Sequence, residues 1–168
     1  MVFAQAPTFT KHPLLALQHA LTPYNDFEKR GQKRSDWFTN ESRGYNVLQS
    51  TKPQTLAYSL QDSPVGLLAW IYEKMHDWSD DFPWTDEEIL QWASIYWFST
   101  AGPAAPQRIY WEVTHEKDPR FTYRAMLEYM PKVKLGLTRN PRELEIFPKA
   151  YGRTLGEVVY EVQNEHGG

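Results

Sequence analysis

The histidines and carboxylates of this 168-residue chain could bind a metal ion or transfer protons, but their spacing argues against a metal site. Two histidines four positions apart on a helix, with a glutamate beside the first, are typical of zinc enzymes. The five histidines, at positions 12, 19, 76, 115 and 166, lack this spacing, and carboxylates do not cluster around them. The acidic runs at 80–81 and 86–88 fit a loop and a helix start. We therefore expect no metal ion.

Motifs that bind phosphate or present a nucleophile are also absent from the sequence. None of the nine glycines falls in GxGxxG or GxxxxGKS spacing, and no GxSxG motif occurs. The chain has no cysteine, which excludes disulfides, thiolate nucleophiles and cysteine-ligated zinc. We therefore expect no cofactor.

Charge and hydropathy exclude two further classes of partner. The chain has 18 basic and 21 acidic side chains, a formal net charge of −3, which gives no reason to expect a nucleic acid partner. No apolar run approaches the ~18 residues that a membrane-spanning helix requires. We therefore expect a soluble chain, and we take the cytoplasm as its compartment.

The aromatic content is unusual. Seven Trp, ten Tyr and eight Phe make up 15% of the residues. Such a surplus indicates either an aromatic-lined cavity or interface, or rings that fill a helical core. Composition alone leaves both interpretations open.

Apolar spacing predicts helices over most of the first 120 residues. The run from Leu14 to Leu21 repeats at helical spacing and stops at Pro23. Residues 24–44 are charged, which favours a helix on the surface. Pro53 opens a further helix.

Three later helices carry start signals. Ser-Pro at positions 63–64 supplies an N-cap and a first-turn proline, and apolar residues then surround most of the helix, so we expect it to be deeply buried. Thr85 and Glu88 form a capping box for the next helix. Pro106 opens a third, which passes through Tyr110.

Beyond residue 120 the pattern changes to that of strands. Residues 132–138 and 157–162 alternate as short strands, with a turn and a short helix between them. Because two strands cannot make a stable sheet on their own, we expect the chain to be incomplete at its C-terminal end.

Three long blocks resemble a known family. They read GYNVLQSTKPQT, DSPVGLLAWIYEK and FPWTDEEILQWASIYWFSTAGPAAPQRIYWE, and they extend from about Gly44 to Glu112. These blocks are similar to the cap region of microsomal-type and fungal epoxide hydrolases, which have the α/β-hydrolase fold. LGLTRNPRELEIFP continues the resemblance into a late core strand and an acid-bearing loop. The fold this implies is mainly α: a helical cap over residues 1–120, then a partial α/β core over residues 121–168 with two strands.

The resemblance also implies three catalytic residues. In the family an aspartate opens the epoxide while two cap tyrosines bind its oxygen, and the matching positions are Tyr45 and Tyr110. A phenol can donate a hydrogen bond or a proton without being ionised at neutral pH. Glu143 matches the acid that orients the catalytic histidine. Arg139 and Asn140, just before it, are more polar than the family pattern.

Other catalytic parts of the family do not occur in this sequence. The nucleophilic aspartate lies in a GGDWG motif, and backbone donors for the oxyanion come from an HGWP loop; neither is present. The catalytic histidine should follow directly after Gly167-Gly168, and His166 matches no catalytic position. We therefore expect a fragment of an epoxide hydrolase that is inactive by itself.

The implied substrate is a small apolar epoxide in the intact parent enzyme. Four aromatic residues are candidates for the pocket wall, with core packing as an equal alternative: Trp70, Trp92, Trp97 and Trp111. A second interpretation is a non-catalytic, aromatic-rich module that binds an apolar ligand or a partner protein, and a third is an α/β-hydrolase that acts on an ester or a halide. Exposed apolar surface would allow self-association.

Overall fold

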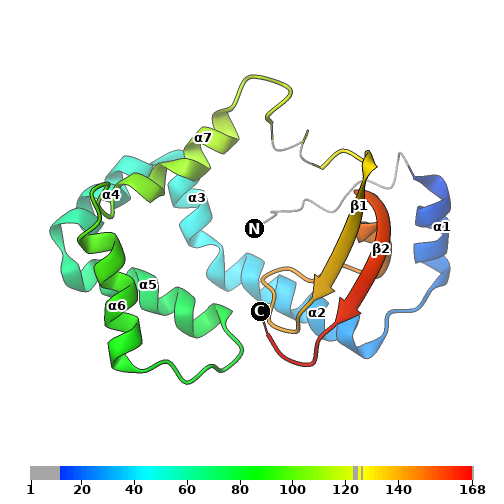
Figure 1. The fold of residues 1–168 in the computed structure, drawn as a ribbon, viewed down its shortest axis with the longest axis horizontal. Helices are drawn as coiled ribbons and strands as arrows, with labels where there is room; N and C mark the ends of the chain where they lie inside the picture. The colour runs from blue at the N-terminus through cyan, green and yellow to red at the C-terminus, as the bar shows by residue number, and fades with distance from the viewer. Residues whose placement is uncertain (1–11, 123–124, 126, 168) are drawn as a thin grey trace. The chain divides into compact units, whose positions relative to one another are not determined.

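A computed structural model describes residues 12–122, 125 and 127–167 of the chain. The helical elements and strands are α1 (Pro13–Leu21), α2 (Asp26–Trp37), the π-helical η2 (Phe38–Ser42), α3 (Gly44–Thr51), α4 (Pro53–Asp62), α5 (Pro64–Trp78), α6 (Asp86–Trp97), the 3₁₀ turn η3 (Ala105–Arg108), α7 (Ile109–His115), β1 (Met130–Arg139), α9 (Lys149–Gly152) and β2 (Gly156–Gln163) (Figure 1). The mainly helical fold with two strands confirms the fold class predicted from the sequence.

Backbone contacts divide the chain into two compact units. Of the described residues, 12–40, 125 and 127–167 form unit 1, and 41–122 form unit 2. Unit 1 holds both strands together with α1 and α2, whereas the regular elements described for unit 2 are all helices. These two units are defined by backbone contacts and not by the cap and core of the family. The predicted cap over residues 1–120 and partial core over residues 121–168 therefore stay a prediction.

The helix starts of unit 2 follow the predicted caps. The Ser63 hydroxyl accepts a hydrogen bond of 3.0 Å from the Gly66 amide, and Pro64 occupies the first turn of α5. At the start of α6, the Glu88 backbone amide donates a 3.3 Å hydrogen bond to the Thr85 hydroxyl. The Thr85 backbone amide donates a 2.9 Å hydrogen bond to the Glu88 carboxylate. These bonds satisfy amides that the first helical turn leaves without a partner.

The predicted deep burial of α5 is wrong. Leu67 is the buried residue of this helix, whereas Val65 is 74% exposed and Tyr72 is 44% exposed. Within unit 2, α4 and α6 pack against α5. A helix that is apolar around most of its circumference is buried only where neighbours surround it, and the described elements cover part of that circumference.

The first and last helices of unit 2 lie side by side. α3 packs against α7 (Figure 1). The η3 turn contacts both α3 and α4. The helix predicted from Pro106 onward is present, but its first turn is the tighter 3₁₀ form of η3 before α7 begins at Ile109. This packing brings together two segments that are far apart in the sequence.

Unit 1 is built around a parallel pair of strands. β1 and β2 pair in parallel, with Leu137 opposite Glu161 and Arg139 opposite Gln163. The segment between them contains α9, as the sequence predicted. Because parallel strands run in the same direction, the loop after β1 and the segment after β2 emerge at the same edge of the sheet.

The prediction of a surface helix at 24–44 needs correction. α2 buries Phe27, Glu28 and Gly31, and Phe38 just beyond it is fully buried. At Gly31 the helix meets Ile146 so closely that an added Cβ would lie 2.4 Å from its Cγ2 atom. The polar pattern of α2 misled the prediction because part of its charge is buried in an ion network rather than exposed to solvent.

Candidate functional site

Tyr45 and Tyr110 meet in unit 2. Tyr45 lies in the first turn of α3, Tyr110 lies in α7, and their ring centroids are 5.8 Å apart at an edge-to-face angle of 82°. Tyr45 is 7% exposed, and its ring also lies 5.0 Å from that of Trp78. The Trp78 indole donates a 3.0 Å hydrogen bond to the Ser42 hydroxyl, which joins α5 to the chain just before α3. The two tyrosines are thus held by aromatic neighbours from three helices.

The phenol of Tyr110 is biased toward its protonated form. Burial raises the pKa of Tyr110, and a side-chain hydrogen bond with Tyr45 opposes this rise in part. A phenol with a raised pKa stays neutral at physiological pH, so it can donate a hydrogen bond to an oxygen that acquires negative charge. Two neutral phenols in contact with each other provide two hydroxyl groups that can donate hydrogen bonds.

A pair of buried amides ties together the segments that carry the tyrosines. The Gln49 side-chain amide of α3 donates a 3.4 Å hydrogen bond to the Gln107 backbone carbonyl in η3, and the Gln107 amide donates to the Pro103 carbonyl at 3.1 Å. Both glutamines are at most 5% exposed. Gln49 lies one turn after Tyr45 and Gln107 one turn before Tyr110, so this tie helps to set the spacing between the two rings.

The four tryptophans expected at the pocket wall lie on three helices of unit 2. Trp70 is on α5, Trp92 and Trp97 are on α6, and Trp111 is on α7. Trp92 and Trp111 are 46% and 44% exposed, and Trp111 stacks on His115 with ring centroids 4.5 Å apart. Their role as a substrate wall stays a prediction.

Glu143 lies in unit 1, in the loop that follows β1. The Asn140 side-chain amide donates a 2.9 Å hydrogen bond to the Glu143 carboxylate, and Asn164 beyond β2 donates to the Asn140 side-chain oxygen at 2.8 Å. The Arg142 amide donates to the Gly167 carbonyl at 3.1 Å. The acid loop and the segment that ends in Gly167 are therefore bonded to each other at one edge of the sheet.

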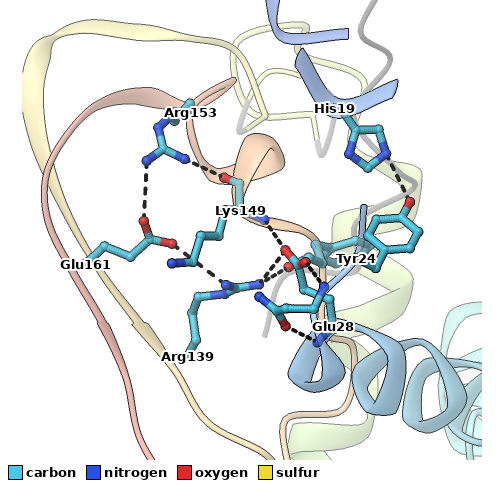
Figure 2. A network of polar contacts seen from close by, with 9 residues as sticks. His19, Tyr24, Glu28, Arg139, Lys149, Arg153 and Glu161 are labelled. Atoms are coloured by element: carbon cyan, nitrogen blue, oxygen red, sulfur yellow. Dashed lines mark hydrogen bonds and ion pairs between the residues drawn. The ribbon is translucent and has the colours of Figure 1, made fainter. Parts of the chain in front are cut away.

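An ion network of unit 1 surrounds the start of this loop (Figure 2). The Arg139 guanidinium donates to the Phe147 carbonyl at 2.6 Å, and it lies 3.8 Å from a Glu28 oxygen and 3.9 Å from a Glu161 oxygen. Glu28 also accepts from the Lys149 amide at 3.2 Å. Arg139, which departs from the family pattern, thus links α2, β2 and the end of the acid loop.

Glu143 also borders a cavity of about 600 Å³ within unit 1. Apolar side chains form much of its wall, among them Phe38, Leu137 and Phe147, and Tyr151 contributes to it as well. Burial raises the pKa of Tyr151, and the neighbouring Tyr24 raises it further. Among the residues that the structure describes, no group of three or more histidines and carboxylates could hold a metal ion, and no helix is long and apolar enough to cross a membrane.

Sequence analysis missed one charged residue beside the tyrosines. Lys74 of α5 places its ammonium nitrogen 4.7 Å from the Trp70 ring centroid and 5.5 Å from that of Tyr45. The signal was present in the sequence, because Trp70, Lys74 and Trp78 follow each other at four-residue spacing and must share one helix face.

Known proteins similar to this chain are epoxide hydrolases. The chain is 33% identical over 147 residues to a protein of Stigmatella aurantiaca named "Putative epoxide hydrolase", a match that covers 84% of this chain and 31% of that protein. It is 35% identical over 83 residues to the juvenile hormone epoxide hydrolase of Bombyx mori, covering 43% of this chain and 18% of that protein. No family model matches the chain.

The chain is also similar to solved structures of epoxide hydrolases. The Aspergillus niger epoxide hydrolase matches with a TM-score of 0.71 and 32% identity over 86% of this chain and 35% of that one. The Bombyx mori juvenile hormone epoxide hydrolase matches with a TM-score of 0.71 over all of this chain and 42% of that one, at 24% identity, which supports the fold alone. The chain thus spans about a third of the length of such relatives. The interpretation as a non-catalytic binding module has no support among them.

Proposed function

Since this chain belongs to the epoxide hydrolases, of which it spans a part, we propose that it supplies the groups that bind and polarise the epoxide oxygen and the acid that orients the catalytic base. The observation that carries the proposal is the meeting of Tyr45 and Tyr110. Their sequence positions match the two tyrosines that the family resemblance assigns to the epoxide oxygen. The proposed parent enzyme converts an epoxide and water into a vicinal diol.

In this proposal the two hydroxyls act on the bond that breaks. When a carboxylate attacks a ring carbon, the carbon–oxygen bond of the epoxide breaks and its electron pair stays on oxygen. Tyr45 and Tyr110 donate hydrogen bonds to that oxygen, and one of them gives it a proton. The raised pKa of Tyr110 supports this role, because the phenol keeps its proton until the oxygen becomes basic. Two donors fixed in advance stabilise the developing charge.

Glu143 serves the second step of the proposed reaction. Attack leaves an ester between the carboxylate and the opened substrate, and a water molecule activated by a histidine hydrolyses it, which releases the diol and regenerates the carboxylate. Gly167 is bonded to the Glu143 loop, and in the family the catalytic histidine follows the Gly-Gly pair that matches 167–168. This contact supports the assignment of Glu143 as the residue that orients that histidine.

We propose a small, apolar epoxide as the substrate, because the helices around the tyrosines carry four tryptophans as candidates for its pocket: Trp70, Trp92, Trp97 and Trp111. A cytoplasmic location is likewise a proposal that rests on composition. The 168 residues contain neither the GGDWG nor the HGWP motif, so we expect the chain alone to bind an epoxide without converting it.

The test replaces the cap of the Aspergillus niger relative with residues 44–112 of this chain and measures hydrolysis of styrene oxide, an apolar aryl epoxide. Tyr45→Phe and Tyr110→Phe in this chimera should each lower kcat about 10²-fold, because each removes one donor to the oxyanion. Tyr72→Phe, on the half-exposed face of α5, should leave kcat unchanged.

A second measurement uses the chain as it is. Styrene oxide added to a sample with ¹³C-labelled tyrosine should shift the resonances of Tyr45 and Tyr110 and leave Tyr160 on β2 unchanged. Full activity of both phenylalanine variants, or no response of either tyrosine to the epoxide, would contradict the proposal.

A further inference from the structure

The ammonium group of Lys74 lies among three aromatic rings of unit 2. Its nitrogen is 4.7 Å from the Trp70 ring centroid, 5.5 Å from that of Trp78 and 5.5 Å from that of Tyr45. Each distance is within the ~6 Å at which a cation is attracted by a ring face. The Lys74 side chain is 16% exposed, so solvent screens its charge less than at an open surface. The cluster therefore joins a cation of α5 to the phenol ring of α3.

Helix geometry fixes two of these contacts, and tertiary packing supplies the third. Trp70 and Trp78 lie four residues before and after Lys74, so both flank it on one face of α5. Tyr45 comes from another helix and reaches this face through its ring contact with Trp78. A lysine that packed only on its own helix would not contact Tyr45. Here the Lys74 ammonium group lies over the ring of Tyr45, a residue of the proposed site.

We propose that Lys74 is a positioning residue for Tyr45: its ammonium group, held between two tryptophans, keeps the phenol ring in place and supplies positive charge over the ring whose hydroxyl binds the epoxide oxygen. This inference rests on the proposed role of Tyr45. When negative charge develops on that oxygen, a cation near the phenol stabilises it through space and makes the hydroxyl a stronger donor. Lys74 itself does not touch the substrate in this proposal.

Charged and titratable neighbours set the size of the effect. Among the described residues, Lys74 of α5 and Tyr110 of α7 are titratable groups that contact the Tyr45 ring. Glu73 forms an ion pair with Lys74, and its side chain is 54% exposed. The Glu73 carboxylate offsets part of the Lys74 charge, so removing it should strengthen the effect of Lys74 on Tyr45.

The experiment titrates Tyr45 in the full chain by NMR of ¹³C-labelled tyrosine, with Tyr45→Phe to assign its resonance. Lys74→Met keeps much of the side-chain volume but removes the charge, and should raise the pKa of Tyr45 by several tenths of a unit or more. Lys74→Arg should restore most of the lost shift. Lys117→Met, an exposed lysine of the same unit, should change nothing.

Glu73→Gln separates charge from packing. It alters an exposed group outside the aromatic cluster, so it should leave the fold intact and lower the pKa of Tyr45, because it removes the negative charge that offsets the charge of Lys74. An unmoved titration in Glu73→Gln, or an equal shift in Lys117→Met, would overturn the proposal even if Lys74→Met fails to fold. None of these titrations uses an epoxide, so their failure is distinguishable from failure of the proposed catalytic role.

Discussion

The pKa of Tyr110 depends on Tyr45 because the two side chains are hydrogen bonded. Burial raises the pKa of Tyr110 and the bond to Tyr45 works in the opposite direction. A raised pKa in the folded chain stabilises the fold below the ordinary phenol pKa, and that contribution is lost as the pH rises through the raised value. The pair should therefore weaken the fold only in strongly alkaline solution.

A substitution at one tyrosine should be visible at the other. Tyr45→Phe removes the hydrogen bond and leaves burial to act alone, so the pKa of Tyr110 should rise further. NMR titration of labelled tyrosine between about pH 8 and 12 measures this, with Tyr72→Phe as the control. A lower pKa of Tyr110 in Tyr45→Phe would mean that Tyr45 does not stabilise the ionised form.

At the residue scale, sequence and structure supply different parts of the site. The positions of Tyr45, Tyr110 and Glu143 came from long motifs, because no property of a single tyrosine or glutamate distinguishes a catalytic group from a packed or solvated one. The surroundings of these residues depend on tertiary contacts. Asn140 looked like a departure from the family pattern, yet its side chain bonds to the Glu143 carboxylate.

At the scale of helices and strands, the sequence predicts helix caps better than it predicts burial. The caps at Ser63 and Thr85 were predictable because a capping bond joins residues three positions apart. The exposure of α5 and the burial within α2 were not, because burial depends on neighbouring elements. Gly31 illustrates this: its packing partner, Ile146, is distant in the sequence.

The contact of α2 with the acid loop should tolerate no added carbon at Gly31. Gly31→Ala would place a Cβ 2.4 Å from Cγ2 of Ile146, and such overpacking should lower the free energy of unfolding by about 1–3 kcal/mol despite the better helix propensity of alanine. Gly44→Ala is the matched control, because a Cβ there meets no atom within 4 Å. Urea unfolding measures both, and an equal response at the two sites would contradict the close packing.

Arg139 joins more segments of unit 1 than local sequence suggests. Arg139→Met leaves the Glu28 and Glu161 carboxylates without this partner and removes the bond to the Phe147 carbonyl. We expect a loss of about 3 kcal/mol, the lower end for a broken buried ion pair, because the two ion contacts are long. Urea unfolding and amide exchange in β1 and β2 report this loss.

The matched control for Arg139 lies in the same network. Arg153 also approaches Glu161, at 3.5 Å, but its side chain is 43% exposed (Figure 2). Solvent screens such a pair, so Arg153→Met should cost no more than about 1 kcal/mol. Equal losses for the two arginines would mean that burial does not set the strength of this network.

On the scale of the whole molecule, a large share of the apolar side chains faces solvent. Val65, Leu90 and Phe98 of unit 2 are 74%, 54% and 81% exposed, and Leu14 and Val159 of unit 1 are 81% and 55% exposed. Contiguous exposed apolar surface favours association. The composition shows that aromatic and apolar residues are abundant. The sequence could not predict which of them face solvent, because the exposure of a side chain depends on the elements that cover it.

We therefore expect the chain to self-associate in dilute solution and to bind a dye specific for apolar surface. Ile95 and Phe98, at and just after the end of α6, are 62% and 81% exposed, so the double variant Ile95→Glu with Phe98→Glu should reduce the average mass measured by light scattering without changing the helical circular dichroism. Thr100→Glu adds a charge nearby but removes no apolar side chain, and should leave the mass unchanged. If the unsubstituted chain is monomeric, the expectation is contradicted. If Thr100→Glu lowers the average mass as much as the double variant does, net charge and not apolar contact controls the association.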